Sequence, residues 1–509
     1  MKIRKRREEK IVFTSEKNKV TLIEDMGHSL VLKAESPQAM LLFIDGKPQK
    51  EIRLESTDTY INLPKQCLRG EIVTVSIRDL SGSQEFLSIR VLAPRVLTPH
   101  EVMARESRAP MPTDLTVRAN HRYKALRAHL EDPIPGMEQA SLWRALEALD
   151  YTYDTVKLRP IKFPKIDEPK VSVIIPAHNK VAVTYYGLCA LLVAHNKASF
   201  EVIVVDDGST DDTKKLEKIV SGIHVVRNSE PQRFIRACNA GVAVSRGEYV
   251  VLLNNDTEAT TGWLDELIWA FERFENVGLA GSKLLYPDGK LQDAGGIVWG
   301  TGNPWNYGNR ENPWEPRFSY ARQADYLSGA AMMTTRAIWD EVGGLSSYLE
   351  PMYFEDTDFA FKVREAGYTT WFIPSSIVYH FEGATSGTDT SRGFKRYQEV
   401  NRPKFKRRWV RDFSAFGKEG QEPNLEKDRG IVGRVLFIDY TTPREDRDAG
   451  SYAARREIEL VQSLGYKVSF LPQNLAHFGS YTEELQKSGV EVIVAPFYLS
   501  VEEFLEKRG

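Results

Sequence analysis

The sequence predicts a multidomain protein in which a small N-terminal β-sandwich and a helical linker precede a central α/β domain, which is followed by a partial C-terminal α/β unit. Three observations predict this class. The chain of 509 residues is too long for a single hydrophobic core, and about 150 residues per domain suggests three or so domains. Short alternating apolar runs occupy residues 20–96, which is typical of antiparallel strands. At Val171 the pattern changes to continuous apolar strands that alternate with helices.

Composition limits the class of protein. A hydrophobic content of 42% and a charged content of 27% are ordinary for a soluble globular protein, and a net charge of −2 gives no reason to expect a nucleic-acid partner. No apolar run is long enough to span a membrane. The cysteines Cys67, Cys189 and Cys238 form neither a zinc pattern nor a disulfide framework. We therefore expect a cytoplasmic protein, soluble or peripheral at a membrane.

The N-terminal third of the chain carries no chemical motif. Residues 1–98 form the β-rich module, and the alternatives of carbohydrate binding, partner binding and scaffolding all stay open. Residues 99–167 form the helical linker region, with helices predicted at Leu115–Leu130 and Gln139–Leu149 on either side of a proline-containing break.

The central domain is expected at residues 168–412. Its predicted strands are Val171–Pro176, Val202–Val205 and Glu248–Leu253, with helices between or beside them. This alternation indicates a mostly parallel sheet with both faces covered. In such sheets ligands bind outside the carboxyl ends of the strands, so the residues at those ends are the candidates for chemistry.

Polar residues follow three of these strands. Asp206-Asp207-Gly208-Ser209 and Asn254-Asn255-Asp256 each follow an apolar strand, and His380 follows a presumed strand at Ser376–Tyr379. Each piece alone is equally typical of a turn, a helix cap or a core residue. Together they favour one crevice in which Asp256 and His380 hold Mg²⁺ or Mn²⁺ against a diphosphate leaving group.

A cluster of acids opens a later helix. Glu355, Asp356 and Asp358 follow Tyr353-Phe354, and acidic charge is favourable at any helix N-terminus. The functional alternative is a general base within reach of an acceptor hydroxyl.

These motifs, in this order and spacing across roughly 240 residues, resemble family 2 glycosyltransferases of the GT-A fold, which is Rossmann-like. The resemblance implies inverting, metal-dependent transfer of a sugar from a nucleotide-sugar donor to an acceptor hydroxyl. The implied residues fall into three groups: Pro176, Asp206, Asp207, Asn255 and Asp256 for the nucleotide sugar, Asp256 and His380 for the metal, and Asp356 and Glu355 for catalysis.

Within these groups the resemblance assigns individual roles. Asp207 contacts the base, Asp356 is the general base and Glu355 orients the acceptor. The first Asp of the family's Asp-x-Asp motif is Asn254 here, which leaves Asp256 as its carboxylate ligand.

The sequence looks most like bacterial rhamnosyl- and O-antigen-type transferases. This implies dTDP-rhamnose or a UDP-hexose as donor, a glycan or lipid-linked glycan as acceptor, and a role in bacterial surface polysaccharide biosynthesis. The stretch 392–411 holds nine basic residues against one acid and is interleaved with aromatics, so it could contact the inner face of the plasma membrane or be a solvated helix face. Trp299, Trp305 and Trp314 lie in a loop where they could contact the acceptor or only pin the loop.

The C-terminal part is expected to be incomplete. Residues 413–433 are predicted to be a linker, and 434–509 supply too few elements for a doubly wound domain, resembling the N-terminal half of a GT-B glycosyltransferase. We therefore expect the chain to be the front of a longer, multi-transferase polypeptide. The alternative function is a catalytically inactive nucleotide-sugar or glycan-binding module of such a protein.

Overall fold

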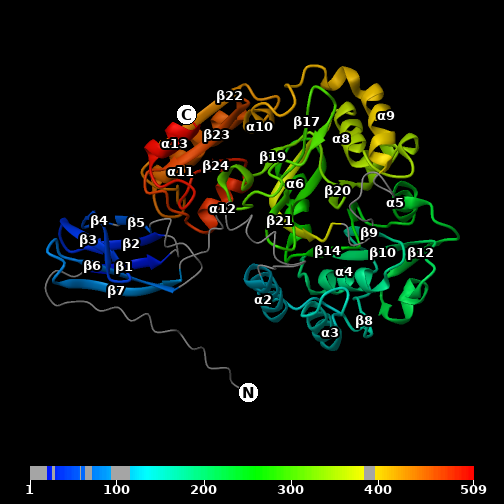
Figure 1. Cartoon of the computed structure of the whole chain (residues 1–509), viewed down its shortest axis with the longest axis horizontal. Helices are drawn as coiled ribbons and strands as arrows, with labels where there is room; N and C mark the ends of the chain where they lie inside the picture. Colours follow the sequence, from blue (N-terminus) through cyan, green and yellow to red (C-terminus); the bar gives the residue numbers. More distant parts are fainter. Residues whose placement is uncertain are drawn as a thin grey trace. The chain divides into compact units, whose positions relative to one another are not determined.

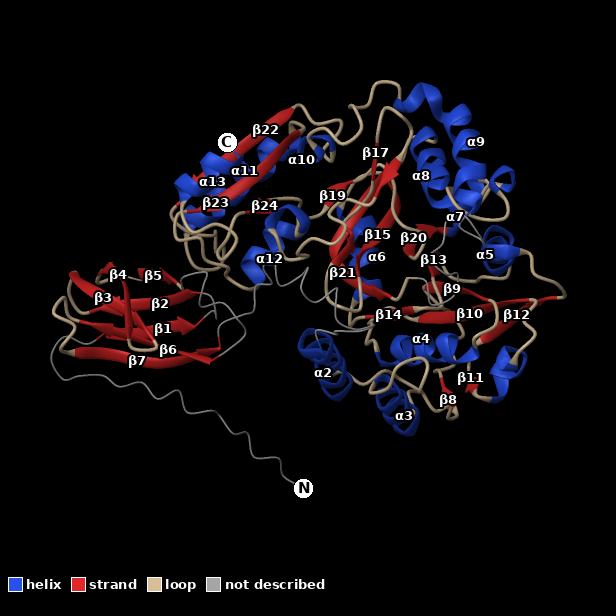
Figure 2. Cartoon of the chain, viewed as in Figure 1, coloured by secondary structure: helices blue, strands red, loops and turns tan. Residues whose placement is uncertain are grey.

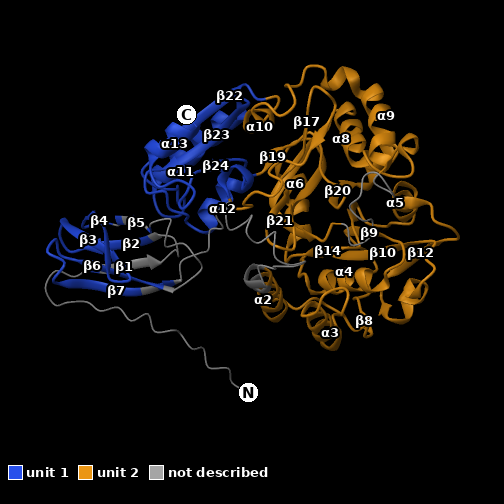
Figure 3. Cartoon of the chain, viewed as in Figure 1, with its two compact units in different colours: residues 1–106, 315–320, 431–509 blue, residues 107–314, 321–430 orange. Residues whose placement is uncertain are grey.

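The computed structural model describes residues 20–25, 29–57, 59–63, 72–92, 115–382 and 396–508. Cys67 and residues 392–395 of the predicted basic stretch lie outside them. The chain divides into two compact units, which Figure 3 colours separately: residues 1–106, 315–320 and 431–509, and residues 107–314 and 321–430. No helix among the described residues has both the length and the apolar character needed to cross a membrane.

The N-terminal strands form two antiparallel sheets, shown in Figure 2, with strand orders β1-β2-β5 and β4-β3-β6-β7. Alternate residues such as Leu30, Leu32, Leu42 and Val75 are buried in one hydrophobic cluster, as the alternating sequence pattern requires. The strands are β1 Val20–Asp25, β2 Ser29–Ala34, β3 Gln38–Ile44, β4 Lys47–Leu54, β5 Thr59–Asn62, β6 Ile72–Arg78 and β7 Glu85–Leu92.

A large sheet forms the centre of the second unit, in the order β12-β10-β9-β13-β20-β15-β21-β14 (Figure 1). Its strands are β9 Val171–Ala177, β10 Phe200–Asp207, β12 His224–Asn228, β13 Tyr249–Leu253, β14 Thr257–Ala259, β15 Val277–Leu285, β20 Ala331–Thr335 and β21 Thr369–His380, and the short β16 Leu291–Asp293 and β19 Arg322–Gln323 pair with β15 and β21. The four strands from β12 to β13 are parallel, whereas β20 runs antiparallel to both of its neighbours. The sheet is therefore mixed, not mostly parallel as the sequence predicts, because apolar runs encode burial and not strand direction.

Helices cover both faces of this sheet. Helix α4 (Val181–Val193) and α6 (Trp263–Arg273) share one hydrophobic cluster with the sheet, and α5 (Arg233–Ala243) packs on the other face, where Gly241 meets Ile174. The remaining helices of this unit are α7 Arg336–Val342, α8 Glu355–Glu365, α9 Arg396–Phe413 and α10 Pro423–Glu426, and its 3-10 helices include η2 Asp212–Lys218 and η4 Ser347–Leu349. The 3-10 helix η3 Pro316–Phe318 belongs to the first unit.

The segment predicted as a helical linker packs on this unit. Helix α2 (Leu115–Glu131) and α3 (Gln139–Leu149) contribute Ala125, Leu142 and Ala145 to the same core as α4 and α6. The short strands β8 (Ile161–Lys162) and β11 (Val220–Ser221) pair with each other, and β17 (Ile297–Val298) pairs with β18 (Pro304–Trp305).

Helix α9 carries all of the described part of the basic stretch, residues 396–411. Its residues Phe405, Trp409 and Phe413 are buried, and Phe405 packs against Phe354 and Phe361 of the same unit. These aromatic residues therefore face the protein interior, which favours the solvated-helix interpretation for this part of the stretch.

The C-terminal elements form a three-stranded parallel sheet with the order β22-β23-β24. They are β22 Gly433–Asp439, α11 Ala449–Ser463, β23 Tyr466–Pro472, α12 Ser480–Lys487, β24 Glu491–Val492 and α13 Val501–Arg508. Strands and helices alternate in this part of the chain, and β24 has only 2 residues.

Candidate active site

The strand ends that carry the predicted motifs meet at one edge of the large sheet. Strand β10 ends at Asp207, and β13, two positions away in the sheet, ends at Leu253 just before the Asn254–Asp256 turn. Strand β14 then pairs antiparallel with β21, with Thr257 opposite His380. This register brings Asp256 beside His380 although 124 positions separate them in the chain.

Asp206 and Asp207 are both buried and both accept several hydrogen bonds. Asp206 accepts from Arg227 Nη1 at 2.8 Å and from the Ser209 backbone N–H at 3.1 Å. Asp207 accepts from the backbone N–H groups of Gln232 and Arg233, each at 2.7 Å, and so binds the start of α5. The carboxylates are therefore rigidly held at the end of β10.

A cavity of about 130 Å³ opens beside Asp207. Predicted residues that line it are Pro176, Asp207 and Asn255, together with Asn254. The Asn255 amide donates to Thr184 Oγ1 at 2.9 Å. Helix α4 approaches this turn closely at Gly187, where a Cβ atom would lie 2.6 Å from the Asn255 carbonyl oxygen. Of the predicted nucleotide-sugar residues, Asp206 and Asp256 do not line this cavity.

Asp256 and His380 face each other, with 3.3 Å between Asp256 Oδ1 and His380 Nε2. His380 Nδ1 donates to Gln292 Oε1 at 2.9 Å, which orients the ring so that Nε2 points to the carboxylate. Asn254 Nδ2 lies 3.2 Å from His380 Nε2. Burial by itself would lower the pKa of His380, but the adjacent Asp256 carboxylate outweighs this effect and raises it.

This pair fits a divalent metal. A carboxylate oxygen and an imidazole nitrogen that converge on one point are donors suited to Mn²⁺, and Gln292 fixes the ring from behind, as partners of metal-binding histidines usually do. Among the described residues no group of three or more His, Cys, Asp or Glu side chains is arranged to hold a metal. Further ligands would therefore be other oxygens, such as those of water or of a bound diphosphate.

Glu355 and Asp356 begin helix α8 and differ in their surroundings. Asp356 accepts from the Gly329 N–H at 3.1 Å and from the Thr357 N–H at 2.7 Å. Burial raises the pKa of Glu355 to about 8, reinforced by the charge of Asp356, and burial also raises the pKa of Asp356. Tyr353 and Phe354, just before the helix, both have positive φ values of 75° and 71°, an unfavourable backbone often found at functional sites.

Asp358, the third acid, has a structural role. It is fully buried and accepts hydrogen bonds from Ser346 Oγ at 2.6 Å, Trp409 Nε1 at 2.8 Å and the Tyr348 hydroxyl. It therefore joins α8 to α9 instead of capping its own helix.

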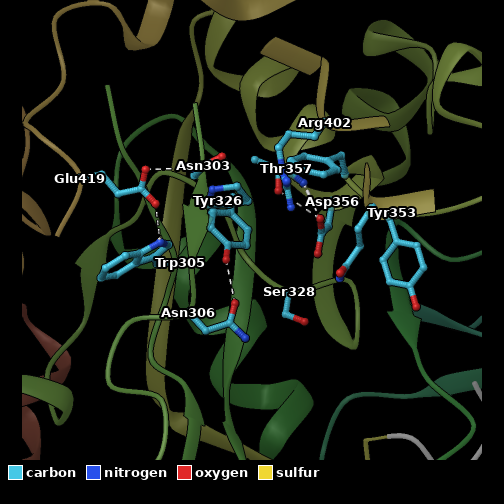
Figure 4. Close-up of a pocket in the computed structure, with 13 residues that line it drawn as sticks. Asn303, Trp305, Asn306, Tyr326, Ser328, Tyr353, Asp356, Thr357, Arg402 and Glu419 are labelled. Carbon is cyan, nitrogen blue, oxygen red and sulfur yellow. Dashed lines mark hydrogen bonds between the residues drawn. The ribbon is translucent and has the colours of Figure 1, made fainter. Parts of the chain in front are cut away.

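A larger cavity of about 470 Å³ opens in front of Asp356 (Figure 4). Asp356 lines it and Glu355 does not. The other lining residues are Asn303, Pro304, Trp305, Asn306, Tyr326, Ser328, Tyr353, Phe354, Thr357, Gln398, Arg402 and Glu419.

Sequence reasoning missed several residues of this site. Gln292 orients His380, and Asp293 beside it is a fully buried carboxyl whose pKa burial raises to about 7, with Arg322 opposing and Asp356 reinforcing the shift. Nothing in the local pattern of β16 distinguishes these residues from a solvated turn. Glu419 lies in the segment predicted as a linker, where no motif draws attention to it.

Residues 172–338, which contain Asp206, Asp207 and Asp256, match the model of glycosyl transferase family 2. The chain carries a glycosyltransferase family 2 domain. This match confirms the predicted family and the predicted class of enzyme.

Several known proteins are similar to the glycosyltransferase domain. The uncharacterized protein y4gI of Sinorhizobium fredii is 35% identical over 294 residues, which cover 54% of this chain and 32% of that protein. The N-acetylglucosaminyl-diphospho-decaprenol L-rhamnosyltransferase of Mycobacterium tuberculosis is 26% identical over 216 residues, covering 37% of this chain and 68% of that enzyme. The chain thus spans about a third of the length of the Sinorhizobium protein.

Among solved structures, that of GalNAc-T7 with UDP, GalNAc and Mn²⁺ is similar at 16% identity and a TM-score of 0.38, covering 52% of this chain and 60% of that chain.

Proposed function

We propose that the glycosyltransferase domain transfers a sugar from a nucleotide-sugar donor to an acceptor hydroxyl with inversion at the anomeric carbon, assisted by a divalent metal. One observation carries this proposal: of the predicted Glu-Asp pair, Asp356 is the carboxylate that lines the larger cavity. A group that accepts a proton from an acceptor must open on the space that holds the acceptor.

On the donor side, the small cavity beside Asp207 would hold the nucleotide. Pro176, Asp207 and Asn255 line it, and Asp206 supports it by fixing the turn after β10. Asp207 is already bonded to the start of α5, so the base would meet a carboxylate whose position is fixed before the donor arrives. Such preorganisation reduces the entropy cost of binding.

The metal, Mn²⁺ or Mg²⁺, would be held by Asp256 and His380. When bound there it would supply positive charge to the diphosphate that leaves with its bonding electrons. Asp256 contributes a negative charge that attracts the cation, and Gln292 keeps His380 Nε2 directed at the same point.

On the acceptor side, Asp356 would remove the proton of the attacking hydroxyl as its oxygen bonds to the anomeric carbon. The N–H groups of Gly329 and Thr357 hold the carboxylate in place. The raised pKa of Asp356 makes it a stronger base than an ordinary aspartate. Because attack and departure occur on opposite faces of the sugar, the product has the inverted configuration.

The neighbouring Glu355 would act differently. Burial and the charge of Asp356 raise the pKa of Glu355 and favour its protonated form, so it would not take the proton of the acceptor. Because Glu355 does not line the larger cavity, it would help orient the acceptor only indirectly, through the start of α8 that carries Asp356.

A pair of isosteric variants tests these roles. Asp356→Asn removes the base, and kcat should fall by roughly 10²–10⁴ with little change in donor affinity. Glu355→Gln replaces one neutral donor by another, so kcat should stay within about tenfold of wild type. An Asp356→Asn enzyme within a few-fold of wild type, or a product that retains the donor configuration, contradicts the proposal.

For the substrates, we infer a donor such as dTDP-rhamnose or a UDP-hexose, and a glycan or lipid-linked glycan acceptor of a bacterial surface polysaccharide. The sequence motifs support this inference, as does the similarity to a mycobacterial enzyme whose name specifies L-rhamnosyl transfer to a sugar on a lipid diphosphate. A hydrolysis and transfer screen across UDP-, GDP- and dTDP-sugars, with and without Mn²⁺ or Mg²⁺, tests it. Turnover of none of these donors would refute the transferase proposal and support the binding-module alternative.

Three finer predictions from the sequence accompany this proposal: a β-sandwich for the N-terminal module, a GT-B-like half-domain for residues 434–509, and a cytoplasmic location at the membrane surface. Two antiparallel sheets around one core support the first, and a parallel βαβ sheet supports the second. Exposed basic residues of α9 support electrostatic contact with an anionic surface without insertion of its buried aromatic residues.

A further inference from the structure

Trp305 is an exposed aromatic residue held in a fixed orientation. Its side chain is 44% exposed and lines the larger cavity. The indole Nε1–H donates to Glu419 Oε1 at 3.1 Å, and the ring packs edge-on against the fully buried Trp299, with 5.2 Å between ring centroids. The sequence alone does not distinguish the three loop tryptophans. In the structure, Trp299 is buried and anchors the loop, whereas Trp305 presents its ring to the cavity.

Glu419 organises this side of the cavity. In addition to Trp305, it accepts hydrogen bonds from Thr301 Oγ1 at 2.6 Å and Asn303 Nδ2 at 2.8 Å. The bond from Thr301 contributes most to lowering the pKa of Glu419, so the side chain stays ionised at neutral pH. Its role is to fix the loop that carries Trp305.

The segment that carries Glu419 is itself anchored to the domain. The Gly300 N–H donates to the Gly417 carbonyl at 2.9 Å, and the Gly417 N–H donates to Glu426 Oε2 at 3.2 Å. The segment of residues 413–430 thus contributes to the wall of the cavity through Glu419, although the sequence predicts a linker there.

The remaining lining is polar but nearly neutral. Asn306 accepts from the Tyr326 hydroxyl at 2.7 Å, and the amides of Asn303 and Gln398 lie on the same cavity. The one lining cation among the described residues, Arg402, is paired with Glu399 at 2.7 Å. Figure 4 shows Trp305 and Glu419 on one side, Asp356 and Tyr353 on the other, and Tyr326 with Asn306 between them.

We propose that this cavity binds the acceptor as an uncharged saccharide, with one sugar ring stacked on Trp305 and a hydroxyl directed to Asp356. The inference rests on the proposed function, and it adds that the part of the acceptor bound in this cavity is an uncharged sugar, together with the residues that select it. A sugar ring has an apolar face of C–H groups that packs on an indole, and a rim of hydroxyls that pairs with amide side chains.

Two other occupants fit the cavity less well. A phosphate group would meet two carboxylates, Asp356 and Glu419, and a guanidinium that already has a carboxylate partner. An alkyl chain would offer no hydrogen bond to the Gln398 amide or to Asn306 Nδ2, whose Oδ1 already accepts from Tyr326, and covering these groups carries a desolvation cost. A neutral, hydroxyl-rich ring satisfies both the aromatic and the amide groups.

Saccharide binding by the full chain, without donor, tests the proposal. The probes are methyl glycosides of glucose, galactose, N-acetylglucosamine and rhamnose, with decyl phosphate as an anionic, apolar comparison, and NMR saturation transfer measures each Kd. At least one glycoside should bind wild type. Trp305→Ala should weaken that binding by roughly three- to tenfold, and Trp305→Phe, which keeps a ring, should weaken it less.

A matched control separates this site from a general effect of losing an exposed tryptophan. Trp314 is 41% exposed but does not line the cavity, and its ring lies near Lys283 instead. Trp314→Ala should therefore leave glycoside binding unchanged. Binding of no glycoside by wild type, equal binding by the Trp305→Ala variant, or preferential binding of decyl phosphate would overturn the inference.

The outcome is distinguishable from failure of the proposed function. If the enzyme turns over a donor but the Trp305→Ala variant binds glycosides as tightly as wild type, the acceptor site alone is refuted. Trp305-dependent binding without turnover of any nucleotide sugar would instead refute the transferase proposal and leave a saccharide-binding site.

Discussion

Replacing Glu258 by Gln should destabilise the glycosyltransferase unit by about 3 kcal/mol. Glu258 lies in β14, two residues after Asp256, and its side chain is almost completely buried. It accepts from Arg122 Nε at 2.9 Å and from Arg118 Nη2, both on helix α2, and from the Tyr186 hydroxyl at 3.3 Å. A glutamine would leave the buried guanidinium of Arg118 and the partly buried guanidinium of Arg122 without this negative partner.

The lowered pKa of Glu258 gives a similar magnitude for the loss of stability. Burial would raise its pKa, but the charges of Arg118 and Arg122 outweigh burial and lower it from 4.5 to about 2. At about 1.36 kcal/mol per pH unit, this difference corresponds to about 3 kcal/mol. Because the pKa is lowered in the folded state, the stabilisation is present above pH 4.5 and is lost as the pH falls toward 2.

Urea denaturation followed by tryptophan fluorescence measures this effect selectively. All 9 tryptophans lie between Trp143 and Trp409, within the unit of residues 107–314 and 321–430. With an m-value of about 3 kcal/mol per M, the midpoint should fall by about 1 M. The control is Glu147→Gln, which removes an exposed ion pair with Arg159 and should cost less than about 1 kcal/mol. Equal costs for the two variants would refute the reasoning.

Three further predictions follow from the site and its boundaries. Asp256→Ala, or excess chelator, should abolish transfer and Mn²⁺ binding measured by calorimetry, with a nearly unchanged melting temperature; full activity without metal would contradict this. The acid limb of kcat should have its midpoint above 3.8, the ordinary value for aspartate, because burial raises the pKa of Asp356, and a midpoint at or below 3.8 would exclude it as the base. Truncation after residue 430 should preserve sugar transfer, whereas truncation after residue 412 should abolish it because Glu419 is removed. Loss of transfer in the first variant, or full transfer in the second, would show that the domain boundary lies elsewhere.

The parts of the fold that depend on local pattern could be predicted from the sequence. Strands β9, β10 and β13 are continuous apolar runs, and polar residues such as Asp207 and Asp256 lie at or just after the ends of β10 and β13. Strand direction could not be predicted, because it depends on the path of the chain between elements. The sequence therefore does not predict that β20 pairs antiparallel with β13.

Within the site, residues that belong to a motif were predicted and residues that support it were not. His380 has a recognisable place in the family's order, whereas Gln292, which orients it, lies in an ordinary-looking short strand. The wall at 413–430 was missed for a related reason: its function depends on contacts with a loop more than 110 positions earlier, as between Glu419 and Trp305. Long-range hydrogen bonds leave no local pattern.

The wall at residues 413–430 has an evolutionary consequence. The residues proposed for the donor lie between Pro176 and His380, whereas the residue that fixes Trp305 comes from a separate, later stretch of the chain that lies beyond the family match at 172–338. Substitutions in that stretch should therefore alter saccharide binding at Trp305 without changing the residues proposed to bind the donor, so the two specificities can vary separately.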